Sequence, residues 1–428
     1  MVDFIKEIGS NFKDKRTGKN TRYEIQDIVL SAFSVFYLQC PSFLSYQQDM
    51  EQAQGNNNAR TLFGIEVIPT DNHVRDLLDA EEPKKLFPVF HEVFHGLEQS
   101  NSLDGFRGCM KQLLFAFDGV EFHRSSKIHC DCCKVTEHTN GKKSYSHGMV
   151  TAVMVKPGCP HVIDLPPEFI VPQDGHEKQD SEQAAIKRWL SVHAKVYSKY
   201  GVTVLGDDLY AHQPTCERII QEQMHFIFTC KPSSHKTLYE NIEGLRRTEL
   251  LDVVEVVRWT GKRREYDRYR FCNELPLRDG KDALKVNWCE LTTTDSSGEV
   301  LYYNAFITDH KIHEKNVAAI VEDGRARWKT ENENNNTLKR QGYNLAHNFG
   351  HGEHNLSNVL TTLNLISFLC HTILAMTSEA YQKIREKLGA RKKFFEHIRT
   401  LIQYLLFESW DNLLAFMMTK LKLRCNTT

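Results

Sequence analysis

The chain has 428 residues, of which 41% are hydrophobic and 25% are charged, and its formal net charge at pH 7 is −1. This composition is typical of a soluble globular protein with core enough for two to four domains. The near-zero charge excludes a protein that holds DNA by bulk electrostatic attraction alone, so any contact with DNA must use local basic patches.

Residues 1–85 are predicted to form a helical domain. Apolar residues between Ile25 and Phe36 fall on one face of a helix, and a second helix is expected after Pro69. A polar turn is expected between them at residues 55–58. This domain either binds DNA or serves only as a packing subdomain.

Two acidic positions follow predicted strands. The apolar run 113–117 leads to Asp118, although Asp118-Gly119 before a second apolar run is also a hairpin-turn signal. The β-branched run 202–206 ends in Asp207 and Asp208. A loop at residues 172–177 and a helix over 181–200 precede this second strand, and a strand–helix–strand order places the two strands in parallel.

Between these strands lies a segment rich in cysteine and histidine. Cys130 and Cys133 have the Cys-x2-Cys spacing of a zinc knuckle, and His129, His138 and His147 are near enough in sequence to complete the ligand set. Because a second Cys-x2-Cys pair is missing, reduced thiols without metal are the alternative. Twelve cysteines without an export signal favour reduced thiols in the cytoplasm.

Residues 234–305 contain short strand-like pieces separated by turns, which predicts a β-rich insertion. Its basic residues alternate with aromatic ones, an arrangement that suits phosphate contacts and base stacking. A charged hairpin edge that resists aggregation is the alternative. The basic residues are Arg258, Lys262, Arg263, Arg264, Arg268 and Arg270.

A third acid lies in a helix predicted to begin near Arg327. Glu331, four residues further on, shares a face with Arg327, which on its own is also typical of a solvated ion pair. Further along, the apolar region 356–376 includes Asn364 and His371, whose polar groups would need partners in hydrocarbon. We therefore predict a buried helix there and no contact with a membrane.

The order of these features resembles the DDE transposases of bacterial insertion sequences, over residues 100–375. Arg327 and Glu331 match the Arg-x3-Glu part of the Tyr-x2-Arg-x3-Glu-x6-Lys signature, while Gly324 takes the tyrosine position and Lys339 arrives one residue late. Asp207-x2-Tyr210 matches the second acid of that family. Two alternatives stay open, and they are Asp208 for the second acid and Glu333 for the third.

The resemblance implies an α/β fold with an RNase H-like mixed sheet flanked by helices. The catalytic core would comprise residues 86–233 and 306–376, with the β-rich insertion 234–305 between them and helical regions at 1–85 and 377–428.

The resemblance also implies an enzyme, a DNA transposase that cuts at element ends and joins them to target DNA. Asp118, Asp207 and Glu331 would hold two Mg²⁺ ions for phosphoryl transfer. Its partners would be the terminal inverted repeats and target DNA. It would assemble as a homodimer and be located at the nucleoid of the bacterial cytoplasm. An RNase H-like nuclease without strand transfer and an inactive DNA-binding relative are the alternatives. DNA contacts are expected from Arg327, Lys339, Lys262, Arg263 and Arg264.

Overall fold

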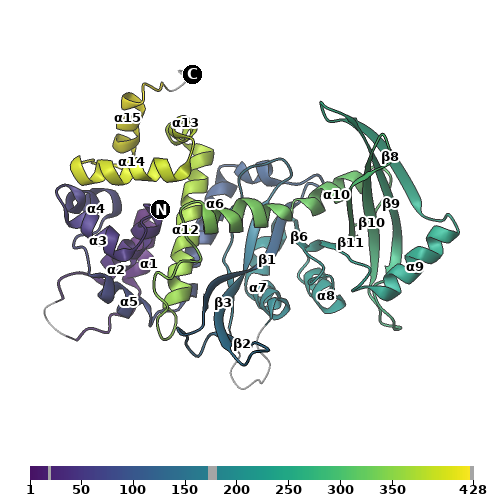
Figure 1. Ribbon diagram of the computed structural model, residues 1–428, viewed down its shortest axis with the longest axis horizontal. Coiled ribbons are helices and arrows are strands. Elements are labelled where there is room, and N and C mark those ends of the chain that lie inside the picture. Colours follow the sequence, from purple (N-terminus) through teal and green to yellow (C-terminus); the bar gives the residue numbers. More distant parts are fainter. Residues whose placement is uncertain (18–20, 172–180, 425–428) are drawn as a thin grey trace.

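The computed structural model describes residues 1–17, 21–171 and 181–424, so the loop predicted at 172–177 lies outside the described residues. An 11-stranded mixed sheet forms the centre, in the order β2-β3-β1-β6-β7-β11-β10-β9-β8, with β4 and β5 paired to β3. Helices gather beyond one end of the sheet and also flank its faces (Figure 1). The predicted α/β class with a mixed sheet is confirmed.

The N-terminal part is helical, as predicted. Its helices are α1 (Val2–Ser10), α2 (Ile25–Tyr37), α3 (Phe43–Glu51), α4 (Gly55–Phe63), α5 (Asp71–Leu78) and α6 (Pro88–Gln99). The polar turn predicted at residues 55–58 is wrong, because these residues begin α4. The buried side chain of Asn58 donates hydrogen bonds to the carbonyls of Ile402 (2.6 Å) and Leu405 (2.7 Å), so distant chain contacts hold this polar segment in a helix.

The first half of the sheet combines antiparallel and parallel pairs. Strand β1 pairs antiparallel with β3 and parallel with β6, and β6 pairs parallel with β7. The alternative prediction of a hairpin turn at Asp118-Gly119 is wrong, since β1 runs through both residues. The bounds are β1 (Leu113–Ser125), β2 (Lys134–Glu137), β3 (Lys143–Val155), β4 (Ile163–Asp164), β5 (Glu168–Ile170), α7 (Glu182–Tyr197), β6 (Val202–Gly206), α8 (Gln213–Gln221) and β7 (His225–Thr229).

The strands of the predicted insertion continue the same sheet. Strand β11 pairs antiparallel with β7, and β10, β9 and β8 follow outward, so that β8 is the edge of the sheet and its hairpin with β9 projects from the body (Figure 1). The elements are α9 (Lys236–Arg247), β8 (Asp252–Trp259), β9 (Arg264–Pro276), β10 (Lys285–Asp295) and β11 (Val300–Thr308).

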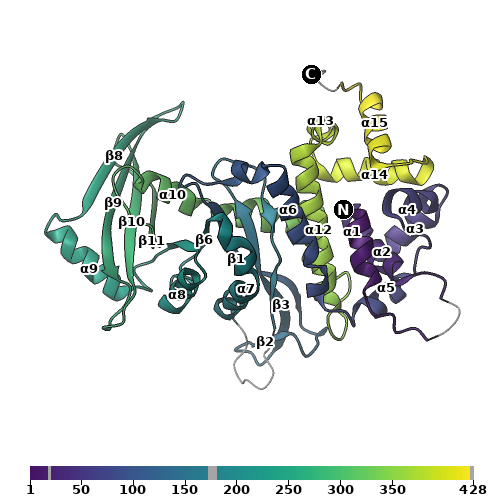
Figure 2. The same cartoon turned by 180° about the vertical axis from the view of Figure 1, so that it is seen from behind.

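The remaining elements are helical: α10 (Val317–Arg325), the π-helix η4 (Thr330–Asn335), α11 (Asn336–Arg340), α12 (Leu356–Thr377), α13 (Glu379–Leu388), α14 (Arg391–Tyr404) and α15 (Trp410–Lys420). Seen from behind, α6 and α7 cross in front of the sheet while α12 separates it from α1–α5 (Figure 2). The helix predicted to begin near Arg327 is confirmed, because after the turn that ends α10 the chain is helical again from Trp328 and stays so through η4 and α11.

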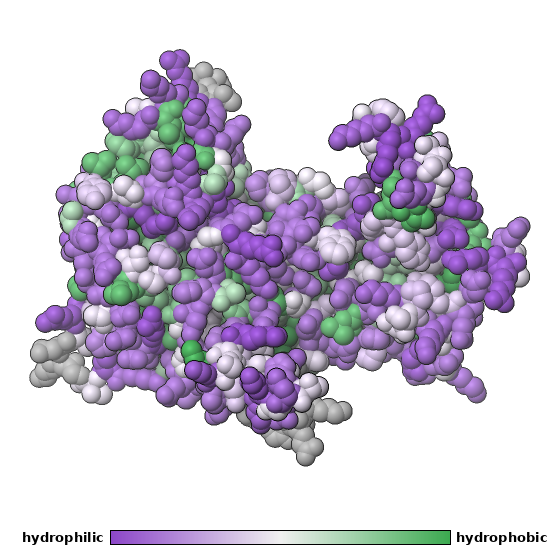
Figure 3. Space-filling view, in the orientation of Figure 1, coloured by the Kyte–Doolittle hydropathy of each residue, from purple (hydrophilic) through white to green (hydrophobic). Residues whose placement is uncertain are grey.

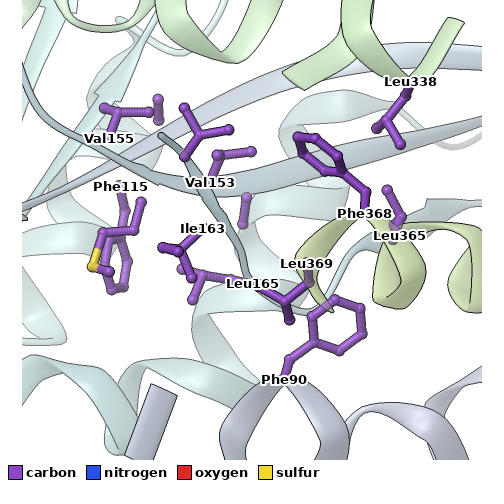
Figure 4. Close-up of a cluster of buried hydrophobic side chains, with 14 of the residues drawn as sticks. Phe90, Phe115, Val153, Val155, Ile163, Leu165, Leu338, Leu365, Phe368 and Leu369 are labelled. Carbon is purple, nitrogen blue, oxygen red and sulfur yellow. The ribbon is translucent and has the colours of Figure 1, made fainter. Parts of the chain in front are cut away.

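Helix α12 joins the sheet to the helical part. In Figure 4, Leu365, Phe368 and Leu369 of this helix meet Phe90 of α6 and Ile163 of β4 in one apolar cluster. The helix is long and apolar enough to cross a membrane by length and composition alone, but 78% of its most apolar window is buried inside the protein. The predicted buried helix is confirmed, and Asn364 and His371 each form one hydrogen bond to Tyr343, although the Oδ1 atom of Asn364 and the Nε2 atom of His371 are buried without a partner in the described part of the chain.

Candidate active site and metal cluster

Strand register brings the first two acids together. In the parallel pair, Ala116 of β1 lies opposite Leu205 of β6. Continuing that register by two residues places Asp118 level with Asp207, which directly follows β6. Asp118 is therefore in the middle of its strand, and only Asp207 stands at a strand end.

The neighbours of Asp207 and Asp208 differ. A carboxylate oxygen of Asp207 accepts a hydrogen bond from the Leu209 amide (2.9 Å), and its negative charge raises the pKa of Asp118. Asp208 instead accepts from the Lys231 amide (2.6 Å) and lies 3.4 Å from the Nε2 atom of His235. Asp207 thus lies near Asp118, whereas Asp208 holds the segment that leads to α9.

The third acid lies on the π-helix η4, which packs against β1 and β3. Glu331 is close enough for its charge to raise the pKa of Asp118, whereas Glu333 forms an ion pair with Lys329 (3.2 Å). A π-helix widens the turn, and such turns are frequent at functional sites. Glu331 therefore lies near Asp118, whereas Glu333 lies beside Lys329.

Two further residues of this segment contact Asp118 directly. The Asn335 side-chain amide donates a hydrogen bond to its Oδ2 atom at 3.0 Å, and Arg327 approaches its Oδ1 atom at 3.8 Å. The Arg327 side chain is only 11% exposed and lies over the ring of Trp328. Arg327, expected to contact DNA, therefore balances the charge of the carboxylates.

A fourth carboxylate, not predicted from the sequence, enters from the start of α7. The Tyr210 hydroxyl donates a hydrogen bond to Glu182 at 3.1 Å. A β-carbon on Gly119 would lie 2.2 Å from the Glu182 carboxyl carbon, so the glycine leaves the space that this side chain occupies. Tyr210, first noted only for its spacing from Asp207, thus positions an acid. We call Asp118, Glu182, Asp207 and Glu331 the carboxylate site.

Negative charge at the carboxylate site exceeds its positive charge. Burial raises the pKa of Asp118 to about 6, Arg327 opposes this shift, and the charges of Glu182, Asp207 and Glu331 add to it. Burial also raises the pKa of Glu182. The hydrogen bond from Tyr210 opposes this shift, and the charge of Asp207 adds to it. Arg327 beside Asp118 and Lys134 near Glu182 do not neutralise four acids, so the site favours a cation or protons.

The remaining predicted DNA contacts lie at the surface. Lys339 is exposed in α11. In the insertion, Arg263 forms an ion pair with Glu265 (3.1 Å), and Arg258, Arg268 and Arg270 also have acidic partners. Among the described residues, Lys262 and Arg264 form no ion pair, and they stand at the tip of the β8–β9 hairpin.

Cys130 and Cys133 form a second site with two histidines. The Sγ atom of Cys133 lies 3.4 Å from the Nε2 atom of His147 and 3.3 Å from that of His351, and the two Nε2 atoms are 3.1 Å apart. All four ligand atoms lie within 4.8 Å of one another. We call these residues the Cys2His2 cluster. Residues capable of binding a metal ion are thus brought together at Cys130 and Cys133, as predicted.

The histidines of the Cys2His2 cluster were only partly predictable. His129 stacks on Tyr145, and His138 bonds to Ser144, so neither belongs to it. His147, the third candidate, does belong. His351 was missed because it lies 204 residues further along the chain. The only local signal for it is the histidine-rich stretch at residues 347–354.

No protein-family model matches the chain, and no curated protein sequence matches it significantly.

Proposed function

We propose that this protein is a DNA transposase with an RNase H-like catalytic core, acting by metal-dependent phosphoryl transfer. The observation that carries the proposal is that strand register sets Asp207 level with Asp118, while η4 packs against β1 with Glu331 near enough for its charge to act on Asp118. The strand arrangement also supports such a core. Strands β3 and β1 pair antiparallel, β6 and β7 continue the sheet in parallel, and α7 precedes β6. The bacterial cytoplasm suits the free thiols of the described cysteines.

The donor type of the carboxylate site suits Mg²⁺, although no three of its carboxylates, all in the described part of the chain, bring ligand atoms within 4.8 Å of one another. Its donors are hard carboxylate oxygens with no sulfur among them, which Mg²⁺ prefers. Uncompensated negative charge gives a cation a reason to bind, and ligands shared between two ions need not all converge on one point. When bound, two Mg²⁺ ions would activate the attacking oxygen and stabilise the leaving oxygen of an in-line displacement.

The residues of the chain would divide the other tasks. The Asn335 amide orients the Asp118 carboxylate by its hydrogen bond, and Arg327 limits the repulsion among the acids. Tyr210 fixes Glu182 beside Asp118. Lys339, exposed on the helix that follows η4, would contact a DNA phosphate.

The experiment that tests the proposal is a product assay. Purified protein is incubated with Mg²⁺ and DNA carrying the inverted repeats that flank its coding sequence, together with a target plasmid. Cleavage at the repeat ends and joined products would support a transposase. Cleavage without joining would favour a nuclease, and binding without cleavage would favour an inactive relative.

The acidity of Asp118 predicts a pH dependence of metal binding. With a pKa of about 6, Asp118 is mostly protonated below that pH, and protons then compete with the cation. We expect the affinity for Mg²⁺ or Mn²⁺ to fall by up to roughly tenfold per pH unit below about pH 6 and to level off above about pH 7. Calorimetric titrations across this range check it, and an unchanged affinity would contradict it.

The proposed DNA path runs between the insertion and α10. An open groove there is lined by the cations Arg258, Arg325 and Lys329, by the acids Asp267 and Glu322, and by Trp328, which is exposed. Arg258 and Lys329 already pair with acids, so Arg325 is the cation of this groove without an ion pair among the described residues. Figure 3 shows the face hollowed between the lobe of α13–α15 and the β8–β9 hairpin, with mainly hydrophilic residues on its surface. Cations beside an exposed aromatic ring suit phosphate contacts and base stacking. Two copies of the chain would bring two element ends together.

The two unpaired cations of the hairpin tip provide a test of this path. Neutralising Lys262 and Arg264 together should weaken DNA binding and reduce the slope of log affinity against log salt by roughly one to two units, because each lost phosphate contact removes about one. Arg263→Gln is the matched control, since Glu265 already compensates Arg263. Fluorescence anisotropy at several salt concentrations measures the slope. An unchanged slope in the folded double variant would assign DNA binding to another surface.

A further inference from the structure

The four ligand atoms of the Cys2His2 cluster have the spacing of a tetrahedron. Zn²⁺ with bonds of about 2.3 Å to sulfur and about 2.0–2.1 Å to nitrogen holds its ligands about 3.3–3.8 Å apart. The distances in the cluster are 3.9 Å between the two sulfur atoms, 3.1 Å between the nitrogens and 3.3–3.5 Å for three of the four sulfur–nitrogen pairs, while the fourth pair, Cys130 with His351, lies within 4.8 Å. Few other arrangements bring two thiols and two imidazoles to one point.

A hydrogen bond outside the cluster fixes which nitrogen of His351 faces it. The Nδ1 atom lies 2.8 Å from the carbonyl oxygen of Gly352. A carbonyl oxygen can only accept, so Nδ1 carries the proton, and Nε2 of the neutral ring presents its lone pair to the cluster. Ligating histidines usually have such a partner on their other nitrogen.

We propose that Cys130, Cys133, His147 and His351 bind one structural Zn²⁺ ion that ties the loop before α12 to the β1–β3 part of the sheet. Thiolates and imidazoles select Zn²⁺ over the hard cations that suit the carboxylate site. Four protein ligands leave no open position for a substrate, which is typical of a structural site. Cys133, His147 and His351 are 3%, 2% and 7% exposed, and Cys130 is partly buried, so the site is largely shielded from solvent.

The ligands come from three separated parts of the chain. Cys130 and Cys133 lie in the connection between β1 and β2, His147 lies on β3, and His351 lies in the loop that enters α12. The same loop is held from the other side by Asp79 at the end of α5, which accepts hydrogen bonds from the amides of residues 353–356. The ion would therefore join the sheet to the helical part of the molecule. This role does not depend on the proposed DNA chemistry.

Metal analysis of the full-length protein, purified in the presence of a weak chelator, tests the proposal. We expect about one zinc per chain in the wild type and in His354→Ala, whose exposed histidine lies three residues from His351 in the same loop. His129→Ala should also keep its zinc. His351→Ala and Cys133→Ser should lose most of it.

His351→Cys keeps the test decisive if the alanine variant does not fold. A cysteine at this position can still ligate, so this variant should retain zinc. After Co²⁺ replacement, its visible absorption should shift and its sulfur-to-cobalt charge-transfer band should strengthen, because a third thiolate is added. Folded wild-type protein without zinc would overturn the proposal, as would a cobalt spectrum identical in the wild type and His351→Cys.

Discussion

Replacing Asp118, Asp207 or Glu331 singly with alanine is expected to abolish cleavage of end-containing DNA, with a loss of at least about 100-fold in rate. Changes to residues that merely support a metal ligand already cost about 10–100-fold, so loss of a ligand should cost more. DNA binding should remain, since none of the three acids attracts a phosphate. Single-turnover cleavage assays with Mg²⁺ and anisotropy with Ca²⁺ separate the two effects.

Asp208 and Glu333 are the matched controls for this experiment. Glu333→Gln should leave cleavage within a few-fold of wild type, because Glu333 pairs with Lys329 away from Asp118. Asp208→Ala should lower thermal stability more than Asp207→Ala, because Asp208 accepts from the Lys231 amide and the Ser234 hydroxyl of a distant segment, whereas Asp207 accepts from the Leu209 amide two residues away. Asp207→Ala should abolish activity. An active Asp207→Ala beside a folded but inactive Asp208→Ala would reverse the assignment of the second acid.

Replacing Asp79 with alanine is expected to give the largest loss of stability among single surface-loop changes. Its carboxylate accepts from four backbone amides, those of residues 353–356, at 2.9–3.0 Å. Hydrogen bonds to a charged group contribute about 1.5–3 kcal/mol each and are not additive, so we expect a loss of roughly 3 kcal/mol. Chemical denaturation measures it, with Asp76→Ala, an exposed acid of the same helix, as the control.

The effect of Asp79 should also depend on pH. Burial alone would raise the pKa of Asp79, but the four backbone donors outweigh burial and lower it. Its contribution is therefore complete above the unfolded pKa of about 3.9 and is lost as pH falls through the lower, folded pKa. The difference between wild type and Asp79→Ala should be constant from about pH 6 to 8 and shrink in acid. A difference that grows in acid would contradict this account.

Patterns within short stretches were predictable because hydrophobic spacing reports how one element meets the core. The helix at Ile25–Tyr37, the strand before Asp207 and the buried helix at Leu356–Thr377 follow from such spacing. Errors arose where distant contacts outweighed local preference. Asn58 lies in a helix because its side chain bonds to residues more than 340 positions away.

The sequence by itself determined the mixed α/β class and identified Cys130 and Cys133 as candidate metal ligands. Only the tertiary structure showed that Glu182 and Asn335 lie beside Asp118, that Arg327 is buried, and that His147 and His351 complete the Cys2His2 cluster. The physical reason is that a side chain's neighbours depend on how whole elements pack. Asn335 lies 217 residues from Asp118, and His351 lies 204 residues from His147, separations at which local patterns carry no information.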